Sequence, residues 1–369
     1  MSELSYLEKL LDGVEVEWKT LGTVIKTVTA SSKLKSQAYR VSGKLPIVDQ
    51  GIKFIAGYTD EDVTPIEAGK YIIFGDHSEH IKYVDFPFVQ GADGLKILSP
   101  ISANAKYIYH AFLKFYKKEL SYKRHWSTAQ QTLIPIPCPD NPEKSLAIQS
   151  EIVRILDKFT ALTAELTAEL TMRKKQYNYY RDQLMNLEER EDTREMSIGD
   201  IYDFQYGTGN TIPKSGGQYP VYGSNGIVGS HDKYNSEDSP VIGHIGAYAG
   251  IVNWGQGKHF VTYNGVICRH KSKEVLQKYA YHLLLLQDFG SKSNSASQPF
   301  VSYNILNAPI VLVPPLQEQA RIVAILDKFD TLTSSITEGL PREIELRQKQ
   351  YEYYRDLLFS FPTSEAASN

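Results

Sequence analysis

The chain holds few residues whose types and spacing could catalyse a reaction. Asp140–Glu143 and Val313–Leu316 each match only part of the Asn/Asp-Pro-Pro-aromatic loop that holds a base in adenine methyltransferases. Asp140, Glu143 and Lys144 are residue types that nucleases use, but their spacing cannot direct three groups to a metal from adjacent strands. The sequence has no GxxxxGKS/T phosphate-binding loop, no HExxH motif and no paired cysteines. We therefore expect a chain without a catalytic site or a bound metal.

One glycine-rich segment, Phe204–Gly209, superficially resembles a cofactor-binding loop. It follows only a short predicted strand and opens no long helix, whereas a dinucleotide-binding loop must do both. We interpret it as a turn, and we expect the chain to bind no cofactor of its own.

The overall composition is ordinary for a globular protein of more than one domain: 369 residues, 42% apolar and 22% charged. Cys138 and Cys268, the only cysteines, form no disulfide framework, which favours the reducing cytoplasm. The first residues lack a signal-peptide pattern, and the longest apolar run, Leu283–Leu286, falls far short of the roughly 20 residues that span a bilayer. We therefore expect a cytoplasmic protein.

The net charge of −3 does not indicate a nucleic-acid-binding protein, but it does not exclude one, because binding requires only a basic face. Lys and Arg exceed Asp and Glu by one residue in 1–145, and again by one in 196–315. The acidic excess lies in the remaining segments, where it suits protein partners better than phosphates.

Two long segments that must position the rest of the chain are duplicated. Ile152–Phe159 is repeated as Ile322–Phe329, 170 positions later, and Arg173–Asp182 is repeated as Arg347–Asp356, at an offset of 174. A repeat of this length indicates repeated architecture. We predict a short amphipathic helix at residues 3–12, whose Tyr6 is spaced by 174 from Tyr180, as Tyr180 is from Tyr354. This spacing favours a circular arrangement with a third fragment of the repeat, although chance similarity of short helices is the alternative.

Apolar positions in both segments follow the alternating three and four spacing of a coiled-coil seam. The first segment departs from it once, at 162–166–170, and the second has three successive fours from 332 to 344. Each extra four adds about 6 Å and nearly preserves the apolar face. Gly339-Leu340-Pro341 should kink or break the second helix. An ordinary helical hairpin accounts for the packing; setting a distance would be an added function.

Short β-type runs fill two other regions. In the first we predict strands at Val24–Val28, Leu45–Val48, Tyr71–Phe74, Ile81–Val84 and Leu95–Leu98, and a helix at Tyr107–Leu120. In the second we predict strands at Ile198–Ile201, Tyr219–Tyr222, Pro240–Ile242, Ile251–Trp254 and Val266–Arg269, and a helix near Glu274–Asp288. The matching order indicates two domains of one fold.

The predicted fold class is α+β, with two similar α/β domains separated by two long helices packed as an antiparallel coiled coil in a circular, pseudo-two-fold organisation. We divide the chain into an N-terminal helix and first domain (1–144), a central helix (145–191), a second domain (192–314), a C-terminal helix kinked near 339–341 (315–360) and a disordered tail (361–369).

Several motifs together connect the chain with a known family. Thr163-Ala164-Glu165-Leu166 and Thr167-Ala168-Glu169-Leu170 are tandem units within the first helical segment, and Pro315–Phe329 and Gln348–Leu358 begin and end the second. With these motifs and its alternating organisation, the chain closely resembles the specificity subunit of bacterial type I restriction–modification enzymes, particularly the IC group. The resemblance is strong over the helical segments and weak over the two domains, which vary within the family.

The resemblance implies that each domain is a target-recognition domain that reads one half of a split, asymmetric double-stranded DNA sequence. It implies that the helices set the unread spacer, through the number of Thr-Ala-Glu-Leu units, and bind two modification subunits. Those partners would carry adenine-N6 methylation and S-adenosylmethionine, and a restriction subunit would carry ATP- and Mg-dependent translocation and cleavage.

Candidate DNA-contacting residues lie in polar loops that also contain aromatic side chains. Arg and Lys can pair with guanine, and Asn and Gln with adenine, whereas other cations contact phosphates and set register. We assign Lys33, Lys35 and Arg40 to phosphates, and the remaining candidates are Lys123, Arg124, His125, Trp126, Lys214, Ser224, Asn225, Tyr263, Asn264, Lys292, Asn294 and Gln298. Each could equally be a solvated loop residue.

Two other functions compete with this reading. A free-standing DNA-binding regulator would need a helix-turn-helix or a basic helix, and the sequence shows neither. A pure coiled-coil scaffold would retain no DNA in a sequence-dependent way. We also expect the isolated chain to bind DNA weakly, and tightly only with its modification subunits.

Overall fold

The computed structural model describes residue 10 and residues 14–188, 190–209, 212, 216–293, 299–335 and 338–361. The chain forms two compact units: unit 1 comprises Met1–Leu166 and Ile344–Asn369, and unit 2 comprises Thr167–Glu343. Within the described residues, no helix is long and apolar enough to cross a membrane. The helix predicted at residues 3–12 lies outside the described residues except for Leu10, as does the predicted tail from 362 to 369. Phe361, predicted as the first residue of a disordered tail, is instead buried in the core of unit 1.

Unit 1 contains two small sheets and a separate strand pair. The first sheet has the order β2 (Ile25–Val28), β8 (Leu95–Pro100), β5 (Tyr71–Gly75), β6 (Ile81–Val84), and the second has the order β4 (Gly57–Thr59), β3 (Leu45–Val48), β7 (Val89–Gln90). The pair joins β1 (Val16–Thr20) to β9 (Leu133–Pro137). The helices of this part are α2 (Leu21–Val24), α3 (Ala105–Phe115), α4 (Trp126–Ala129) and the 3-10 turn η1 (Ser36–Ala38).

Unit 2 repeats this plan with a single larger sheet. Its order is β11 (Tyr202–Tyr206), β16 (Gly265–His270), β14 (Ser236–Gly243), β15 (Val252–Val261), β12 (Tyr219–Gly223), β13 (Gly226–His231). A separate pair joins β10 (Arg194–Ser197) to β17 (Ile310–Val313). The helices are α6 (Ile198–Ile201), α7 (Gln277–Leu285) and α8 (Tyr303–Asn307).

The strand pairings confirm that the two units share one fold. β5 pairs antiparallel with β8 so that Gly75 faces Leu95, and β14 pairs with β16 so that Gly243 faces Gly265. β3 runs parallel to β7, as β12 does to the end of β15. The long strand β15 therefore takes the place of both β6 and β7, which is why unit 2 has one continuous sheet.

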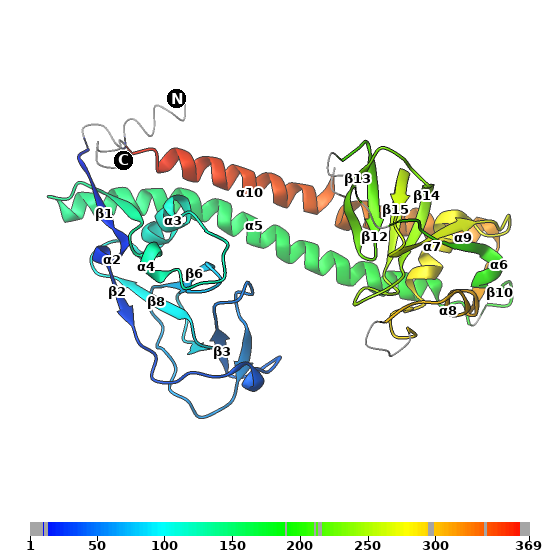
Figure 1. Cartoon of the computed structure of the whole chain (residues 1–369), viewed down its shortest axis with the longest axis horizontal. Helices are drawn as coiled ribbons and strands as arrows, with labels where there is room; N and C mark the ends of the chain where they lie inside the picture. The colour runs from blue at the N-terminus through cyan, green and yellow to red at the C-terminus, as the bar shows by residue number, and fades with distance from the viewer. Residues whose placement is uncertain are drawn as a thin grey trace. The chain divides into compact units, whose positions relative to one another are not determined.

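Three long helices carry the duplicated motifs: α5 (Pro142–Met185), α9 (Leu316–Ser334) and α10 (Gly339–Leu358). In unit 1, the beginning of α5 runs beside the end of α10 (Figure 1). There the ring of Phe159 stacks on that of Tyr354, with centroids 4.8 Å apart. In unit 2, the end of α5 packs against α9, and Tyr180 stacks on Phe329 at 5.7 Å. Each Ile-Leu-Asp-Lys-Phe repeat therefore meets the tyrosine-rich end of the other helical segment.

Corresponding buried residues tie each sheet to the long helices. In unit 1, Phe74 of β5, Tyr107 of α3 and Ile152 of α5 belong to one core and are fully buried. Their counterparts in unit 2 are Ile242, Tyr279 and Ile322, which are also fully buried in a single core. The apolar faces of the repeats thus anchor the sheet units.

The predicted break in the second helical segment is confirmed, slightly before the predicted position. α9 ends at Ser334 and α10 begins at Gly339, whose φ of +79° is unfavourable for a residue with a side chain. Pro341 lies in the first turn of α10, where its missing N–H costs no helical hydrogen bond. The first segment is continuous, as predicted, but it runs from Pro142 to Met185 rather than from 145 to 189.

Several local predictions were wrong. Ile198–Ile201 is helix α6 rather than a strand, because Ser197 and Asp200 form a reciprocal capping box. Val24, placed at the start of a strand, instead closes α2. The helix predicted at Tyr107–Leu120 ends at Phe115, and Leu120 has a positive φ that no helix permits. The helix predicted near Glu274–Asp288 is shorter, spanning Gln277–Leu285.

Candidate nucleic-acid interface

Each unit gathers several loops at the end of its central strand. In unit 1, loops 49–55, 76–80, 91–94 and 117–125 converge beyond Gly75, the last residue of β5. In unit 2, loops 224–225, 244–250, 262–264 and 299–303 converge beyond Gly243, the last residue of β14. We call these two surfaces loop end 1 and loop end 2. They are topologically equivalent, since the backbone N–H of His125 donates to the Asp76 carbonyl just as that of Val301 donates to the His244 carbonyl.

A chain of polar contacts crosses loop end 1. The ammonium of Lys33 lies 3.3 Å from the carboxylate of Asp93, whose backbone carbonyl accepts a hydrogen bond from the Gln50 side chain at 3.1 Å. The Gln50 side-chain oxygen accepts from the N–H of His77, and the ring Nδ1 of His77 lies 3.1 Å from the carbonyl of Lys123. Two residues far apart in sequence, Lys33 and Lys123, are therefore brought to one surface.

Two buried charges on the β5–β6 hairpin hold the loops in place. The carboxylate of Glu79, 2% exposed, accepts hydrogen bonds from the Tyr116 hydroxyl and from the backbone N–H groups of Glu119 and Leu120. Burial raises the pKa of Glu79, but these three donors outweigh burial and lower it below its ordinary value. We conclude that loop 117–125 is built around a buried carboxylate that stays ionised.

The second buried charge is Lys82, which is 6% exposed. Its ammonium donates to the carbonyls of Asp49 and Lys53, at 2.7 and 2.6 Å, and so holds loop 49–55. Burial lowers the pKa of Lys82, while Asp49 opposes that shift. This lysine is a structural residue, whereas Lys53 in the loop that it holds is exposed.

The four neighbouring candidates of unit 1, residues 123–126, differ in exposure: the first two lie at the surface and the next two turn toward the core. Lys123 and Arg124 are exposed, although Lys123 also forms an ion pair with Glu119. His125 is fully buried, its Nε2 lies 2.8 Å from the Ser121 carbonyl, and we correct its assignment to DNA contact. Trp126 starts α4, and its half-buried ring lies 5.9 Å from that of Phe74 at the margin of the core, so its contact with DNA stays a prediction. The chain turns inward here because the Asp76 carboxylate accepts hydrogen bonds from the backbone N–H groups of the buried His125 and the half-buried Trp126.

The three cations that we assigned to phosphates are all exposed, but they do not form one patch. Lys33 lies at loop end 1 through its contact with Asp93. Lys35 precedes the short turn η1. Arg40 forms a backbone bridge with Tyr58 and lies 3.5 Å from Asp60, beside β4. Of these three cations, only Lys33 is connected to the Lys123 loop by polar contacts within the part of the chain that the structure describes.

Loop end 2 is built from aromatic rings instead of charges. The ring of Tyr206 stacks on His244 and on Tyr303, each with centroids 4.2 Å apart, and Tyr263 meets His244 edge-on at 5.1 Å. Tyr263 is 46% exposed and Tyr303 is 36% exposed. The His244 Nδ1 also lies 3.1 Å from the Tyr263 carbonyl, which fixes this turn. An exposed aromatic cluster of this kind can stack on bases or pack against thymine methyl groups.

Most other unit 2 candidates border this cluster. Ser224 and Asn225 form the two-residue turn between β12 and β13, and the Asn225 side chain is exposed. Asn264 is half-buried, and its carbonyl accepts from the His244 N–H at 2.8 Å. Lys292 is exposed after a turn stabilised by the Ser291 hydroxyl. Lys214, Asn294 and Gln298 lie outside the described residues.

Sequence reasoning missed several residues at the two loop ends. In unit 1 they are Gln50, His77 and Tyr122, whose ring is 95% exposed and stacks on His77 at 5.8 Å. In unit 2 they are Tyr206, His244 and Tyr303. No local pattern marks them, because they come from segments that only the strand pairings bring together. The only sequence pattern that pointed to loop end 2 was the pair of glycine-flanked polar turns around Asn225 and Asn264.

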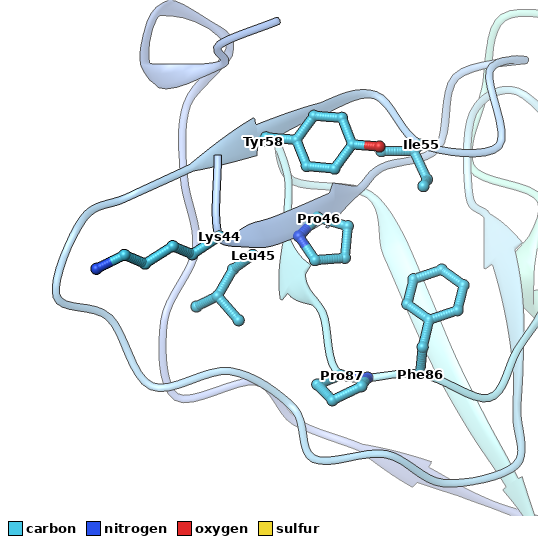
Figure 2. Close-up of a pocket in the computed structure, with 7 residues that line it drawn as sticks. All are labelled: Lys44, Leu45, Pro46, Ile55, Tyr58, Phe86 and Pro87. Carbon is cyan, nitrogen blue, oxygen red and sulfur yellow. The ribbon is translucent and has the colours of Figure 1, made fainter. Parts of the chain in front are cut away.

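An apolar pocket of about 320 Å³ lies beside the three-stranded sheet of unit 1. It is lined by Lys44, Leu45, Pro46, Ile55, Tyr58, Phe86 and Pro87, and Figure 2 shows the Lys44 ammonium directed away from the rings. None of these seven side chains is a carboxylate, imidazole or thiol. The pocket therefore offers no acid–base or metal chemistry.

The tandem Thr-Ala-Glu-Leu units lie within the continuous helix α5. The Thr163 hydroxyl donates to the Phe159 carbonyl four residues earlier, and Glu169 forms an ion pair with Arg173 at 2.7 Å. Leu166 and Leu170 are half-buried, whereas Glu165 and Ala168 are exposed. The units therefore present an apolar stripe and a polar face, as their four-residue period predicts.

Comparisons with known proteins match the whole chain. A family model described as type I restriction modification DNA specificity domain matches residues 13–172 and 190–346. The type I restriction enzyme EcoR124I/EcoR124II specificity subunit of Escherichia coli is 43% identical, with 100% of both chains covered. The EcoprrI specificity subunit of the same species is 36% identical over 92% of this chain and 93% of the relative.

A solved structure supports the fold. The S subunit of a type I restriction–modification system from M. genitalium superposes with a TM-score of 0.60 at 18% identity, covering 95% of this chain and 98% of that one. At this identity the likeness concerns the arrangement of helices and strands.

Proposed function

The chain belongs to the type I restriction–modification DNA specificity family, and we propose that each of its units reads one half of a split DNA target. One observation carries the proposal beyond the family: two units of the same topology present equivalent loop ends with different chemistry. Since the loop ends differ, the two half-sites should differ as well, and the complete target should be asymmetric.

Loop end 1 suits contact through hydrogen bonds and charge. Arg124 is exposed, and no contact of its side chain is found among the described residues. A free guanidinium can pair with O6 and N7 of guanine in the major groove, which discriminates by about 1–3 kcal/mol. Lys33 and Lys123 are partly neutralised by Asp93 and Glu119, so they suit phosphate contacts that set position.

Loop end 2 suits contact through ring surfaces and amides. Tyr263 and Tyr303 are partly exposed at the edge of the stacked cluster, and Asn225 is exposed on the adjacent turn. An asparagine can pair with N6 and N7 of adenine, while a tyrosine ring can contact a thymine methyl group. We therefore propose that the second half-site contains A·T pairs.

The helical segments have a separate role in the proposal. We propose that residues 1–144 and 192–314 recognise DNA, whereas 145–191 and 315–360 set the spacer and bind two modification subunits. Adenine-N6 methylation with S-adenosylmethionine, and ATP- and Mg-dependent cleavage, would belong to modification and restriction subunits. The acidic excess of the helical segments supports protein partners there, because acidic surface repels phosphates.

The test is to co-express the chain with a type I modification subunit and to sequence methylated adenines across a genome. We expect one split, asymmetric motif with a fixed spacer. A symmetric motif would favour a free-standing dimeric regulator, and no motif together with no sequence-dependent DNA retention would favour a pure scaffold. Either result would overturn the proposal.

A further inference from the structure

Each unit contains an equivalent polar cluster where three helices meet. Helix junction 1 comprises Lys106 and His110 of α3, Asp157 of α5 and Tyr351 of α10. Helix junction 2 comprises Lys278 and His282 of α7, Asp327 of α9 and Tyr177 of α5. Every member of one junction has a counterpart in the other, and each junction lies within a single unit.

In helix junction 1, a buried histidine joins the sheet unit to both long helices. The His110 side chain is almost completely buried, and its Nδ1 lies 2.8 Å from the Tyr351 hydroxyl. Its Nε2 lies 3.8 Å from a carboxylate oxygen of Asp157, whose other oxygen accepts from the Lys106 ammonium at 2.7 Å. α3, α5 and α10 are therefore connected through one imidazole.

Helix junction 2 repeats the central contact. His282 is 1% exposed, and its Nδ1 lies 3.3 Å from the Tyr177 hydroxyl. The Lys278 ammonium lies over the ring of Trp254, 3.9 Å from its centroid. Burial raises the pKa of Asp327 above its ordinary value, and the charge of Lys278 opposes that shift. In both junctions the histidine Nε2 is buried without a hydrogen-bond partner among the described residues.

The flanking residues are duplicated as well. The Arg355 guanidinium lies 5.8 Å from the Tyr351 ring, and the Arg181 guanidinium lies 5.7 Å from the Tyr177 ring. One helical turn further along, Phe159 stacks on Tyr354 and Phe329 stacks on Tyr180. The same set of contacts thus occurs where each Ile-Leu-Asp-Lys-Phe repeat meets a tyrosine-rich repeat.

Such a junction is sensitive to helix register in a way that an apolar seam is not. A slip of one residue rotates a helix by 100° and moves it by about 1.5 Å, which takes the tyrosine hydroxyl away from the histidine. The buried groups would then lose their partner, which is costly. A stripe of leucines, in contrast, tolerates stutters of four residues.

We propose that His110–Tyr351 and His282–Tyr177 are positioning contacts that fix the helix register in each unit. They would thereby restrict the complex to DNA targets with one spacer length. The inference rests on the proposed function. On α5, the two Thr-Ala-Glu-Leu units at 163–170 lie between Asp157 of one junction and Tyr177 of the other. With both ends locked, a change in helix length cannot be absorbed by slippage and must change the spacer.

The experiment compares a double variant with a matched control in the complex with modification subunits. Tyr351→Phe with Tyr177→Phe removes only the two hydroxyls. Tyr353→Phe with Tyr179→Phe changes two tyrosines on the same helices that are each 60% exposed. Methylated adenines are then mapped across a genome for the wild type and both variants.

We expect sites with a spacer one base pair longer or shorter to rise about ten-fold in the junction variant, with unchanged bases in both half-sites. The control should keep the wild-type spacer. Methylation that is weaker but confined to the wild-type spacer would overturn the proposal that these contacts fix helix register. It would show that the two His–Tyr contacts only stabilise the fold. If the double variant assembles no complex, each single Tyr→Phe variant is mapped by the same criterion. Absence of any split motif in the wild type would instead overturn the proposed function.

Discussion

At the scale of single residues, adjacent positions in one loop have opposite roles. Arg124 is exposed at loop end 1, whereas His125 is buried directly after it. The Asp76 carboxylate accepts the backbone N–H groups of His125 and Trp126, and this turns the chain inward. The sequence cluster of residue types that commonly contact DNA is therefore divided by one buried carboxylate, that of Asp76. Its first residues stay at the surface, and the following ones turn toward the core.

Truncating one exposed side chain in each unit should alter one half-site each. Arg124→Ala should relax the base preference of the first half-site, and Tyr263→Ala that of the second, each costing about 1–3 kcal/mol of discrimination. The measurement is the sequence of methylated sites in the complex with modification subunits.

Lys70→Ala is the control for Arg124→Ala, because Lys70 is exposed and precedes Tyr71, at the opposite end of β5 from loop end 1. It should leave both half-sites unchanged. If Arg124→Ala and Tyr263→Ala alter the same half-site, the assignment of one half-site to each unit is wrong.

At the scale of elements, buried glutamines of the repeat connect the long helices to the sheet units. The Gln149 side-chain oxygen accepts from the Asn104 N–H at 2.8 Å, just before α3. The Gln319 oxygen accepts from the Leu276 N–H at 2.8 Å, just before α7. Both glutamines are almost completely buried. The repeat therefore preserves attachment points as well as an apolar seam.

The attachment of α7 should weaken in acid. Burial, followed by the charges of Lys278 and Arg181, lowers the pKa of His282 to about 4. A histidine in the unfolded chain has a pKa of about 6.5. Below this pH the unfolded chain binds a proton at His282, whereas the folded chain keeps the imidazole neutral. The contribution of neutral, buried His282 to the free energy of unfolding is fully present above about pH 6.5 and is lost as the pH falls toward 4. Between pH 7 and pH 5 the loss is about 2 kcal/mol.

Urea unfolding at pH 7 and pH 5, followed through Trp254, measures this effect, because Trp254 is the only tryptophan of unit 2. His282→Gln cannot titrate and should lose about 2 kcal/mol less than the wild type over the same range. Equal pH dependence in both proteins would exclude His282 as the group responsible.

At the scale of the whole molecule, unit 1 is not a continuous stretch of chain, whereas unit 2 is one, from Thr167 to Glu343. Unit 1 is completed by residues from Ile344 onward, and Leu358, Phe359 and Phe361 are buried in its core. The Phe359 ring lies 5.1 Å from that of Tyr107. The end of the chain therefore supports the first unit, which agrees with the circular arrangement that the repeats indicate.

Lengthening α5 between the two helix junctions should lengthen the spacer. A third Thr-Ala-Glu-Leu unit inserted after Leu170 adds about 6 Å of helix, comparable with one or two base-pair steps. We expect methylated sites with the same half-sites and a longer spacer. Recognition of the original spacer would show that helix length does not set the distance. A Thr167→Ser variant of unchanged length is the control and should keep the original spacer.

The sequence alone determined the repeated organisation, the presence of a break in the second helical segment and the family, because periodic apolar residues and a Gly-Leu-Pro motif act locally. It also identified exposed loop residues such as Arg124, Asn225 and Tyr263. Only the tertiary structure placed Gln50 and His77 beside Lys123, stacked Tyr206 on His244 and Tyr303, and buried His125. These arrangements depend on strand pairings and buried charges that join distant segments, which no local pattern encodes.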